Sequence, residues 1–483
     1  MNIANAAKFM NAEISGFNPA LLSTEVKTIA IDSREVQAGD VFFALSQPDY
    51  KNNCFNGDFE DSHKYVPSAF EKGAMACVVR PDRFTEYKEL LEPFKDRLLL
   101  VDDAILALQN LAHGVYLEWN KPVVAVTGSA GKTTAKELTA HVLRSSGKRI
   151  LSNIKNYNNG LGHPLTVLRI LSEGEFDAAV LEMGMSTPDN EIARLCRITP
   201  PDVAVELNVL PVHLEHLGSI ENIAKAKAEL VEGMKTGGTA ILNADDFRVS
   251  AMAQLSKGSV LTYGIDNQAD VSASNIIFAS FGETKFTLNT PNESVEVLFP
   301  LNGSHNILNA LAASAVGLTF GMTAQGVATA LKTVTPPPQR GEILRFKNGV
   351  TVINDSYNSN PDALLSMVKT LVEGSNGANR KIVVAGEMRE LGSDAAQIHT
   401  KTGKRIADFA IDALYGVEGF AKNLTEGAHE KGLQNVKFYE NSTVAGEEFI
   451  NEIQPGDVVL VKGSRGVKTE KVIEKLLSNF ELE

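Results

Sequence analysis

A glycine-rich segment at residues 127–134 has the residue types of a phosphate-binding loop. It reads T-G-S-A-G-K-T-T and follows the apolar run V-V-A-V. Gly128 and Gly131 let backbone N–H groups turn toward a phosphate. Lys132 can neutralise phosphate oxygens, and Thr133 can bind Mg²⁺ through its hydroxyl. The common pattern G-x-x-x-x-G-K-[ST] also needs a glycine at position 126, where the chain has valine, so a glycine-rich turn before an exposed helix is the alternative interpretation.

Charged side chains downstream could complete a nucleotide site. Glu182 ends the apolar run A-A-V-L-E, at the edge where parallel sheets bind ligands, and could hold magnesium or orient a nucleophile. The stretch H-L-E-H, which begins at His213, offers further metal ligands, and Lys227 lies in the helical stretch A-K-A-K-A-E-L. Taken alone, strand-end glutamates often meet only solvent, single histidines are more often packed or solvated, and helix lysines are mostly surface charges.

The apolar runs predict the sheet that would carry these side chains. Between residues 119 and 334, continuous apolar runs alternate with helical stretches. Such runs are typical of strands buried on both faces, so we expect a parallel sheet with crossover helices. Residues 270–300 change character and predict antiparallel strands added to that sheet.

The chain is expected to be an α/β protein of three domains, because 483 residues exceed what one core usually holds. A proline after a helix-like segment at Trp119–Pro122 marks the first boundary, and the run Pro336–Pro338 marks the second. The predicted domains are a small N-terminal α/β domain at 1–118, a central phosphate-loop domain at 119–334 with a mostly parallel sheet and added antiparallel strands, and a Rossmann-like domain at 335–483.

Composition narrows the class of protein. A formal net charge of −13 argues against non-specific nucleic-acid binding, and any phosphate site must be locally positive. Three cysteines without metal-ligand spacing suit a reducing compartment. The sequence shows neither a signal-peptide pattern nor an apolar run long enough to span a membrane. We therefore expect a cytoplasmic protein without a membrane anchor.

The order of several motifs resembles that of the Mur ligases, ATP-dependent amide-forming enzymes of peptidoglycan synthesis. These motifs are T-G-S-x-G-K-T-T, N-Y-N-N-G-L-G-H-P-L-T-V-L, L-E-M-G-M, H-L-E-H-L-G-S and K-A-K-A-E. The family's loop is G-x-x-G-K-T-T, so valine at position 126 fits it. The resemblance implies two magnesium ions, with Thr133, Glu182, His213 and a carbamylated Lys227 as ligands. It also implies a catalytic set of Lys132, Glu182, His213 and Lys227.

The same resemblance implies the residues that bind ATP and the other substrates. In the segment G-S-H-N-I-L-N-A, Asn306 would read the adenine base, and Arg340 would reach the ATP phosphates. The implied ATP-binding residues are Thr127, Gly128, Ser129, Ala130, Gly131, Lys132, Thr133, Thr134, Asn306, Asn309, Arg340 and Asp355. The implied substrate residues are Asp32, Ser33, Arg34, Asn158, Asn159, Tyr357, Asn358, Asn360, Lys462, Ser464 and Arg465.

The motif Y-N-x-N-P at residues 357–361 is similar to the family branch that adds D-alanyl-D-alanine to UDP-N-acetylmuramoyl-tripeptide. The implied reaction consumes ATP and passes through an acyl phosphate. Because water would hydrolyse this intermediate, we expect the third domain to close over the site. Two departures occur: residues 47–62 form a longer segment than the usual turn, and Asp189-Asn190 stand where the family often has a glycine before glutamate.

Two alternatives remain open at the level of sequence. One is a ligase that adds a single amino acid, or an enzyme like folylpolyglutamate synthetase. The other is a phosphate-loop protein that binds nucleotide without ligation. The sequence does not fix the third residue of the acceptor tripeptide, L-lysine or diaminopimelate, or the base for the incoming amine. It leaves the oligomeric state open, and a monomer is the default expectation.

Overall fold

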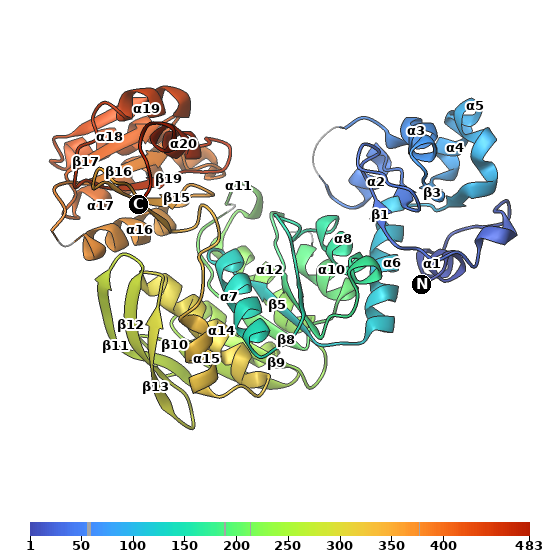
Figure 1. The fold of residues 1–483 in the computed structure, drawn as a ribbon, viewed down its shortest axis with the longest axis horizontal. Coiled ribbons are helices and arrows are strands. Elements are labelled where there is room, and N and C mark those ends of the chain that lie inside the picture. Colours follow the sequence, from blue (N-terminus) through green and yellow to red (C-terminus); the bar gives the residue numbers. More distant parts are fainter. Residues whose placement is uncertain (56–58, 188–189, 213, 376) are drawn as a thin grey trace.

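The computed structural model describes residues 1–55, 59–187, 190–212, 214–375 and 377–483, and of Leu214 and His216 only the backbone. Three separate sheets follow one another along the chain, each flanked by helices (Figure 1). The N-terminal and C-terminal parts lie at opposite ends of the molecule, with the central part between them. The predicted α/β class is confirmed. In the described part of the chain, no helix is both long and apolar enough to cross a membrane.

The N-terminal part contains a four-stranded parallel sheet, which confirms the small α/β domain predicted there. Its strands lie in the order β1-β2-β3-β4 and are buried over most of their length. The strands are β1 (Ile29–Ala30), β2 (Val41–Phe43), β3 (Ala76–Val79) and β4 (Leu98–Leu100). The helices are α1 (Ile3–Met10), α2 (Gln47–Asn52), α3 (Val66–Glu71), α4 (Pro81–Glu86), α5 (Lys88–Leu91) and α6 (Ala104–Trp119).

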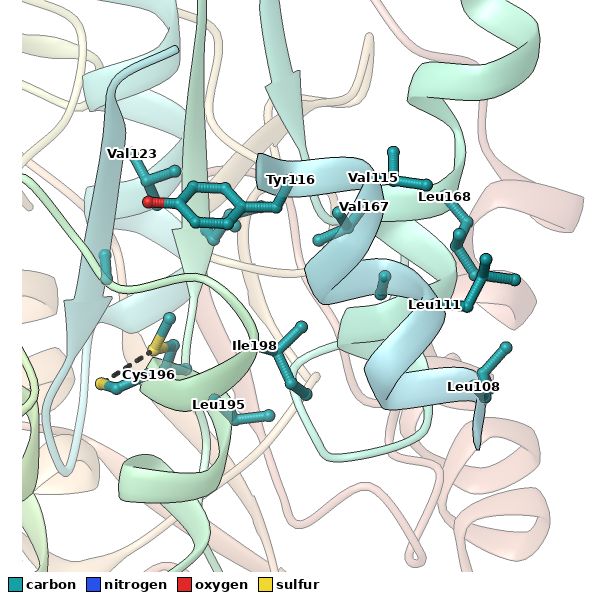
Figure 2. Close-up of a cluster of buried hydrophobic side chains, with 14 of the residues drawn as sticks. Leu108, Leu111, Val115, Tyr116, Val123, Val167, Leu168, Leu195, Cys196 and Ile198 are labelled. Atoms are coloured by element: carbon teal, nitrogen blue, oxygen red, sulfur yellow. Dashed lines mark hydrogen bonds between the residues drawn. The ribbon is translucent and has the colours of Figure 1, made fainter. Parts of the chain in front are cut away.

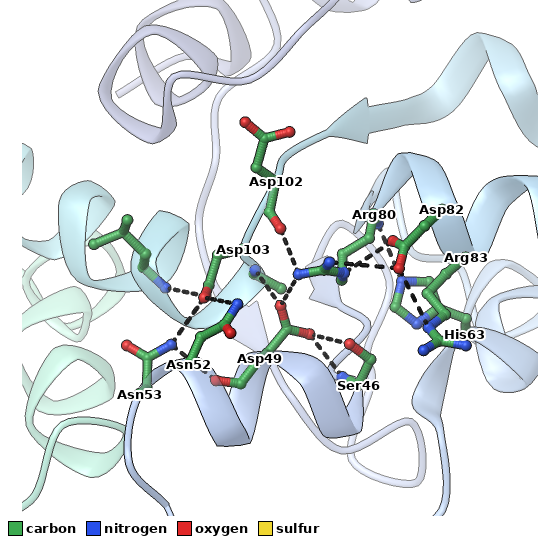
Figure 3. A network of polar contacts seen from close by, with 12 residues as sticks. Ser46, Asp49, Asn52, Asn53, His63, Arg80, Asp82, Arg83, Asp102 and Asp103 are labelled. Carbon is green, nitrogen blue, oxygen red and sulfur yellow. Dashed lines mark hydrogen bonds and ion pairs between the residues drawn. The ribbon is translucent and has the colours of Figure 1, made fainter.

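The longer segment that departs from the Mur ligase pattern begins with helix α2, and a buried polar network holds it (Figure 3). Asp49 is completely buried, and its Oδ2 accepts hydrogen bonds from the Ser46 N–H at 2.8 Å and the Ser46 hydroxyl at 2.5 Å. Its Oδ1 pairs with Arg80 Nη1 at 3.1 Å and accepts the Ala104 N–H at 2.9 Å. A buried carboxylate needs such partners, so this network fixes the start of α2 against α6.

Helix α6 joins the N-terminal part to the central part. It begins at the N-cap Asp103, whose side chain accepts the Leu106 N–H, and ends at Asn120 in the left-handed conformation. Its apolar face packs on α8 (Gly162–Leu168) and α10 (Glu191–Ile198), as Figure 2 shows. The contacting side chains include Leu108, Leu111 and Val115 of α6, Val167 and Leu168 of α8, and Leu195 and Ile198 of α10. One hydrophobic cluster therefore spans both parts, and the division of the chain at residue 118 stays a prediction.

The central sheet has nine strands in the order β13-β12-β11-β10-β9-β8-β5-β7-β6. The six strands β5 to β10 run parallel, and β11 continues this direction beside β10. Strand β12 is antiparallel to both of its neighbours, β11 and β13, which agrees with the antiparallel strands predicted for residues 270–300. The strands are β5 (Val123–Thr127), β6 (Ile150–Ser152), β7 (Ala178–Glu182), β8 (Val203–Glu206), β9 (Thr239–Asn243), β10 (Ser259–Gly264), β11 (Val271–Ser280), β12 (Glu283–Asn289) and β13 (Ser294–Phe299).

Helices cover both faces of this sheet. Successive buried side chains of β5 therefore belong alternately to two apolar clusters, one on each face. One cluster includes α7 (Lys132–Ser145), α14 (Ser304–Thr319) and α15 (Ala324–Leu331), and the other includes α6, α8, α10 and α12 (Ile220–Glu232). The remaining helices of the central part are α9 (Ile170–Glu173), α11 (Leu214–Leu217) and α13 (Phe247–Ala251).

The C-terminal part has a six-stranded sheet in the order β14-β15-β19-β16-β17-β18, in which only β14 is antiparallel to its neighbour. The strands are β14 (Glu342–Arg345), β15 (Thr351–Asp355), β16 (Lys381–Gly386), β17 (Ala413–Val417), β18 (Val436–Tyr439) and β19 (Val458–Lys462). The helices are α16 (Pro361–Gly374), α17 (Ala395–Ala407), α18 (Ala421–Glu430), α19 (Ser442–Phe449) and α20 (Glu470–Asn479). This arrangement agrees with the doubly wound type predicted for the third domain.

The central and C-terminal parts touch through the turn between β11 and β12. Phe281 packs within the apolar cluster of the C-terminal part, and its carbonyl accepts a hydrogen bond from Arg345 Nη2 at 2.6 Å. A Cβ atom at Gly374 would lie 2.4 Å from the Phe281 ring, so α16 approaches this ring closely. These contacts join the end of α16 and strand β14 to the turn between β11 and β12.

Candidate active site

The predicted phosphate loop connects strand β5 to helix α7. Strand β5 is buried throughout, and α7 begins directly after Gly131, which has a φ of 83°. A Cβ atom at Gly131 would lie 2.7 Å from Asn309 Oδ1 on helix α14. Only glycine fits this conformation and this close approach, so the loop is seated against α14. The N-terminus of α7 faces the cavity described below, where it favours an anion.

Lys132 lies at the start of α7 with its ammonium group turned back onto the loop. Its Nζ donates to the Gly128 carbonyl oxygen at 2.8 Å. Burial lowers the pKa of Lys132, Glu182 opposes this shift, and the guanidinium of Arg340 adds to it. The side chain therefore lies in a field set by charges from both walls of the site.

Glu182 ends strand β7 beside the loop, because β5 and β7 are parallel neighbours with Val126 opposite Glu182. Its Oε2 accepts a hydrogen bond from the Thr133 hydroxyl at 2.8 Å. Its Oε1 accepts another from Asn158 Nδ2 at 2.7 Å. Mg²⁺ prefers oxygen ligands and, in nucleotide sites, binds one or two protein oxygens together with phosphate oxygens. The neighbouring Thr133 hydroxyl and Glu182 carboxylate therefore fit magnesium.

Metal sites built from protein side chains alone combine several acidic, histidine or cysteine groups. Across residues 1–55, 59–187, 190–212, 214–375 and 377–483, no group of three or more His, Cys, Asp or Glu side chains could hold a metal ion. The predicted ligand His213 lies outside the described residues. Phosphate oxygens and water would complete the octahedral shell of a magnesium ion held by Thr133 and Glu182.

One cavity of about 440 Å³ lies between the central and C-terminal parts. Its central wall carries the loop, Glu182 and the first turns of α14. Its C-terminal wall carries the segment before β14, the ends of β15 and β19, and the start of α16. The sequence-predicted residues that line it are Ser129, Ala130, Gly131, Lys132, Thr133, Thr134, Asn158, Glu182, Asn306, Asn309, Arg340, Asp355, Tyr357, Asn358, Asn360 and Lys462.

Helix α14 contributes amide and imidazole groups to the cavity. Asn306 is buried and lines the cavity, and its Nδ2 donates to the Asn302 carbonyl oxygen at 2.8 Å. The neighbouring His305 Nδ1 lies 3.0 Å from the Ser366 hydroxyl of α16. Burial lowers the pKa of His305 to about 4, so the imidazole is neutral near pH 7. This contact links the central wall to the C-terminal wall.

The C-terminal wall is ordered by ion pairs and a helix cap. Lys462 Nζ pairs with Asp355 Oδ2 at 2.6 Å and donates to the Asn358 carbonyl oxygen at 2.8 Å. Asn360 caps α16 because its Oδ1 accepts the Ala363 N–H at 2.8 Å. The N-terminus of α16 therefore also faces the cavity, opposite the N-terminus of α7.

Several predicted residues do not line this cavity. The Thr127 hydroxyl is buried and donates to the Met183 carbonyl oxygen at 2.7 Å. The Ser464 hydroxyl accepts the Arg389 N–H at 3.0 Å, and Arg465 Nη1 pairs with Glu470 at 2.6 Å. Gly128, which is predicted to contact ATP, faces Lys132 through its carbonyl oxygen.

The predicted uridine-diphosphate end of the substrate site lies in the N-terminal part. Arg34 is exposed and bonds to Asp32 through Nε and Nη2, which lowers the pKa of Asp32 to about 2. Lys72 Nζ donates to the Ser33 carbonyl oxygen at 2.8 Å. A smaller cavity of about 150 Å³ lies nearby, between Ile31 and the stretch 156–165, and Asn159 lines it.

Lys227 is buried below the loop, and its neighbour Glu206 is a residue that the sequence analysis missed. Both Glu206 carboxylate oxygens lack a hydrogen-bond partner among the described residues. Burial, and to a lesser degree Lys132, lowers the pKa of Lys227 to about 7, while Glu206 opposes this shift. Burial also raises the pKa of Glu206. The signal was present in the sequence, because V-A-V-E ends a strand in the same way as A-A-V-L-E ends β7.

Asn208 is a second residue without a sequence-level prediction. Its Oδ1 accepts the Ala130 N–H at 2.8 Å, and its Nδ2 donates to the Ala130 carbonyl oxygen at 3.1 Å. This two-way bond holds the loop against the end of β8. His305 and Ser366 also line the cavity without having been singled out, since neither stands next to a recognisable strand end.

Comparisons with known proteins agree with these features. Residues 126–317 match the family described as "Mur ligase middle domain", and residues 339–465 match "Mur ligase, glutamate ligase domain". The UDP-N-acetylmuramoyl-tripeptide--D-alanyl-D-alanine ligase of Bacillus subtilis (strain 168) is 32% identical over 480 residues, covering 99% of this chain and 98% of that protein.

Two solved structures have a similar fold over nearly the whole chain. The crystal structure of MurF from Acinetobacter baumannii has a TM-score of 0.86 and 27% identity, and the match covers 99% of both chains. MurF ligase from Thermotoga maritima, solved in complex with ADP, has a TM-score of 0.79 and 27% identity, covering 94% of this chain and 97% of that one.

Proposed function

The chain belongs to the Mur ligase family, and we propose that it joins D-alanyl-D-alanine to UDP-N-acetylmuramoyl-tripeptide with consumption of ATP. The products are UDP-N-acetylmuramoyl-pentapeptide, ADP and phosphate. The resemblance stated from the sequence motifs is thereby confirmed at the level of the family. The same activity is printed in the name of the Bacillus subtilis relative that matches the chain over its full length.

One observation carries this proposal beyond family membership. The cavity of about 440 Å³ places the phosphate loop and Glu182 on one wall and Tyr357, Asn358 and Asn360 on the other. The residues predicted to bind ATP and the motif typical of the dipeptide-adding branch therefore lie on opposite walls of one cavity. This is the arrangement that a transfer from ATP-activated carboxylate to a dipeptide amine requires.

The chemistry begins with a poor electrophile, because a carboxylate does not react with an amine in water. We propose that an oxygen of the tripeptide carboxylate attacks the γ-phosphorus of ATP, so that a C–O–P bond forms and ADP leaves. The amine of D-alanyl-D-alanine then attacks the acyl carbon and loses a proton to solvent, the amide bond forms, and phosphate departs with the carboxylate oxygen. The first step brings two anions together, and Lys132, Arg340 and the loop N–H groups supply the opposing charge.

Magnesium is a further part of the proposal. Thr133 and Glu182 would hold the ion, which when bound would neutralise charge on the phosphates. The chain's own contribution is to fix Glu182 between the Thr133 hydroxyl and the Asn158 amide, so that the carboxylate needs no rearrangement.

We extend the proposal to a carbamate on Lys227, which together with His213 would hold a second magnesium ion. The amine adds to CO₂, one proton leaves to solvent, and a carboxylate group results. The support is a buried amine whose pKa lies near 7, so that a neutral nucleophilic form is present. Carbon-13 NMR with labelled bicarbonate should show a carbamate signal in the wild type and none in Lys227→Ala. If the wild type shows no carbamate signal after incubation with labelled bicarbonate, this modification is ruled out.

The experiment that tests the proposed activity is phosphate release with tripeptide substrate and ATP. D-Alanyl-D-alanine should stimulate release strongly, whereas D-alanine, L-alanine and L-glutamate should not. Stimulation by one of the single amino acids would identify a different branch of the family. Nucleotide binding without stimulated release would contradict ligation altogether. Parallel assays with L-lysine and diaminopimelate at the third peptide position assign the acceptor.

A further inference from the structure

The guanidinium of Arg340 is in an unusual position for a charged group on a cavity wall. It lines the cavity, yet the described residues offer its side chain neither an ion pair nor a hydrogen bond. Its charge is felt across the cavity, since it contributes to the lowered pKa of Lys132. An arginine without an anionic partner is free to receive phosphate oxygens, but its long side chain would sample many rotamers unless something holds it.

The group that holds it is the ring of Tyr357. Arg340 Cζ lies 4.1 Å from the centroid of that ring, which is well inside the range of a cation–π contact. Arg465 Cζ lies 5.9 Å from the same ring, but Arg465 is already paired with Glu470. Of the two arginines near this ring, Arg340 is therefore the one whose guanidinium remains available to a ligand.

The fold sets this contact through main-chain pairing. Arg340 stands two residues before β14, and Tyr357 stands two residues after β15. These strands are antiparallel, and Glu342 is paired with Asn354 at the end nearest the cavity. The Gly341 N–H donates to the Asn354 carbonyl oxygen at 3.0 Å, and the Tyr357 N–H donates to the Gln339 carbonyl oxygen at 3.3 Å. The two side chains are thus brought together by a hydrogen-bonded frame.

We propose that Tyr357 is a positioning residue whose ring holds the Arg340 guanidinium in the cavity, ready to meet the ATP phosphates. The inference rests on the proposed function for its role in turnover. It assigns to the first residue of the Y-N-S-N-P motif a task in phosphate chemistry, in addition to any contact with the dipeptide. A preoriented cation stabilises developing charge without reorganisation during the reaction.

Four variants test the proposal: Tyr357→Leu, Tyr357→Phe, Arg340→Lys and the double variant Tyr357→Leu/Arg340→Lys. Tyr357→Leu should lower kcat about tenfold while the KM for D-alanyl-D-alanine changes little. Tyr357→Phe, which keeps the ring face, should restore most of that kcat. In the Arg340→Lys background, Tyr357→Leu should cost less than about twofold further, because the two side chains act as a unit. If the two kcat losses multiply in the double variant, the proposal is overturned. It is also overturned if Tyr357→Leu raises only the KM for D-alanyl-D-alanine and leaves kcat unchanged.

A second measurement is independent of ligation. The affinity for a non-hydrolysable ATP analogue should fall in Tyr357→Leu and Arg340→Lys by similar factors and no further in the double variant. If the wild type binds the analogue but shows no release with D-alanyl-D-alanine, the proposed function fails while this coupling is still measured. Additive losses of affinity would contradict the positioning role on their own.

A control variant and a series of fluorinated side chains separate loss of the cation–π contact from a general disturbance of the fold. Phe247 is 70% exposed, and the guanidinium of Arg248 lies 4.3 Å from its ring, outside the cavity. Phe247→Leu therefore removes a similar contact and should leave kcat unchanged. If Tyr357→Leu is poorly folded, phenylalanines of increasing fluorination at position 357 weaken the ring's attraction for a cation without changing its shape. A steady decrease of kcat along that series supports the proposal, and a flat series overturns it.

Discussion

At the scale of single residues, the site is organised around the Glu182 carboxylate. Its two oxygens accept hydrogen bonds from the Thr133 hydroxyl and the Asn158 amide. These hydrogen bonds fix the orientation of the carboxylate, and a fixed carboxylate loses little side-chain entropy when it binds a ligand. The roles of Thr133 and Glu182 can therefore be tested by changes that remove one oxygen ligand.

Thr133→Val is expected to lower kcat about a hundredfold and to raise the magnesium concentration needed for half-maximal rate. The substitution keeps the shape of the side chain but removes the hydroxyl oxygen. The control is Thr139→Val on the same helix, because the buried Thr139 hydroxyl has no hydrogen-bond partner among the described residues and its loss should not matter. Equal magnesium dependence in both variants would contradict the assignment of Thr133.

Stability should depend on pH through His163. This imidazole is completely buried, Nε2 lies 2.7 Å from the Thr199 hydroxyl, and burial lowers its pKa to about 3. The unfolded chain takes up a proton as the pH falls below about 6.5, whereas the native chain does not. The contribution of His163 to the free energy of unfolding is therefore fully present above pH 6.5 and is lost as the pH falls toward 3.

Chemical unfolding of the wild type and of His163→Gln at a series of pH values measures this effect. Between pH 6.5 and 4.5, the free energy of unfolding should fall by about 2 kcal/mol more in the wild type than in the variant. His305, with a pKa lowered to about 4, contributes with the same sign in both proteins and cancels in the comparison. Parallel pH profiles would show that His163 is not held neutral.

Residue types at strand ends made part of the site predictable from sequence. Lys132, Thr133 and Glu182 were found because each stands at a recognisable junction between a strand and a loop or helix. Glu206 stands at an equivalent junction and was missed, since no resemblance drew attention to it. Asn208, His305 and Ser366 act through contacts between distant segments, which spacing along the chain does not reveal.

At the scale of elements, the junction of β5 and α7 depends on Gly131. Its φ of 83° is unfavourable for a side chain, and a Cβ atom would meet Asn309 Oδ1 at 2.7 Å. Gly131→Ala is expected to destabilise the fold by about 1 kcal/mol and to weaken ATP-analogue binding about tenfold, because Asn309 must move.

Gly147→Ala provides the matched control for Gly131→Ala. Gly147 has a φ of 84°, but a Cβ atom there would have nothing within 4 Å. Thermal unfolding should show a similar small loss of stability in both variants, while calorimetric titration should show weaker nucleotide binding only in Gly131→Ala. A loss of affinity in both variants would mean that backbone strain, not the contact with Asn309, is responsible.

The pattern of elements was largely predictable, and its exceptions have physical causes. Continuous apolar runs predicted β5, β7, β8 and β9 because both faces of these strands are covered. Strand β6 has three residues at the edge of the sheet and gave little signal. Helix α2 depends on the buried network around Asp49, whose partners Arg80 and Ala104 are remote in the sequence.

At the scale of the whole molecule, the cavity is shared by the central and C-terminal parts of the chain, and we expect these parts to approach one another during the reaction. An acyl phosphate exposed to water would be hydrolysed, so exclusion of solvent is required. The hydrogen bond from Arg345 to Phe281 and the contact of His305 with Ser366 already join the two parts. We therefore expect the C-terminal part to pivot near these contacts.

Small-angle scattering tests this expectation. The radius of gyration should decrease when an ATP analogue and UDP-N-acetylmuramoyl-tripeptide are both present, and less with either alone. Arg345→Ala, which removes the hydrogen bond to Phe281, serves to locate the pivot because it should alter the unliganded scattering curve. An unchanged radius with both ligands bound would contradict closure.

The most direct test of the account follows oxygen from the substrate into phosphate. The tripeptide substrate is labelled with oxygen-18 in its reacting carboxylate, turned over with ATP and D-alanyl-D-alanine, and the released phosphate is analysed by mass spectrometry. Formation of an acyl phosphate predicts that each phosphate carries one labelled oxygen and that the pentapeptide product contains the new amide. Unlabelled phosphate, with the label retained in the peptide or lost to water, would contradict activation of the carboxylate by ATP.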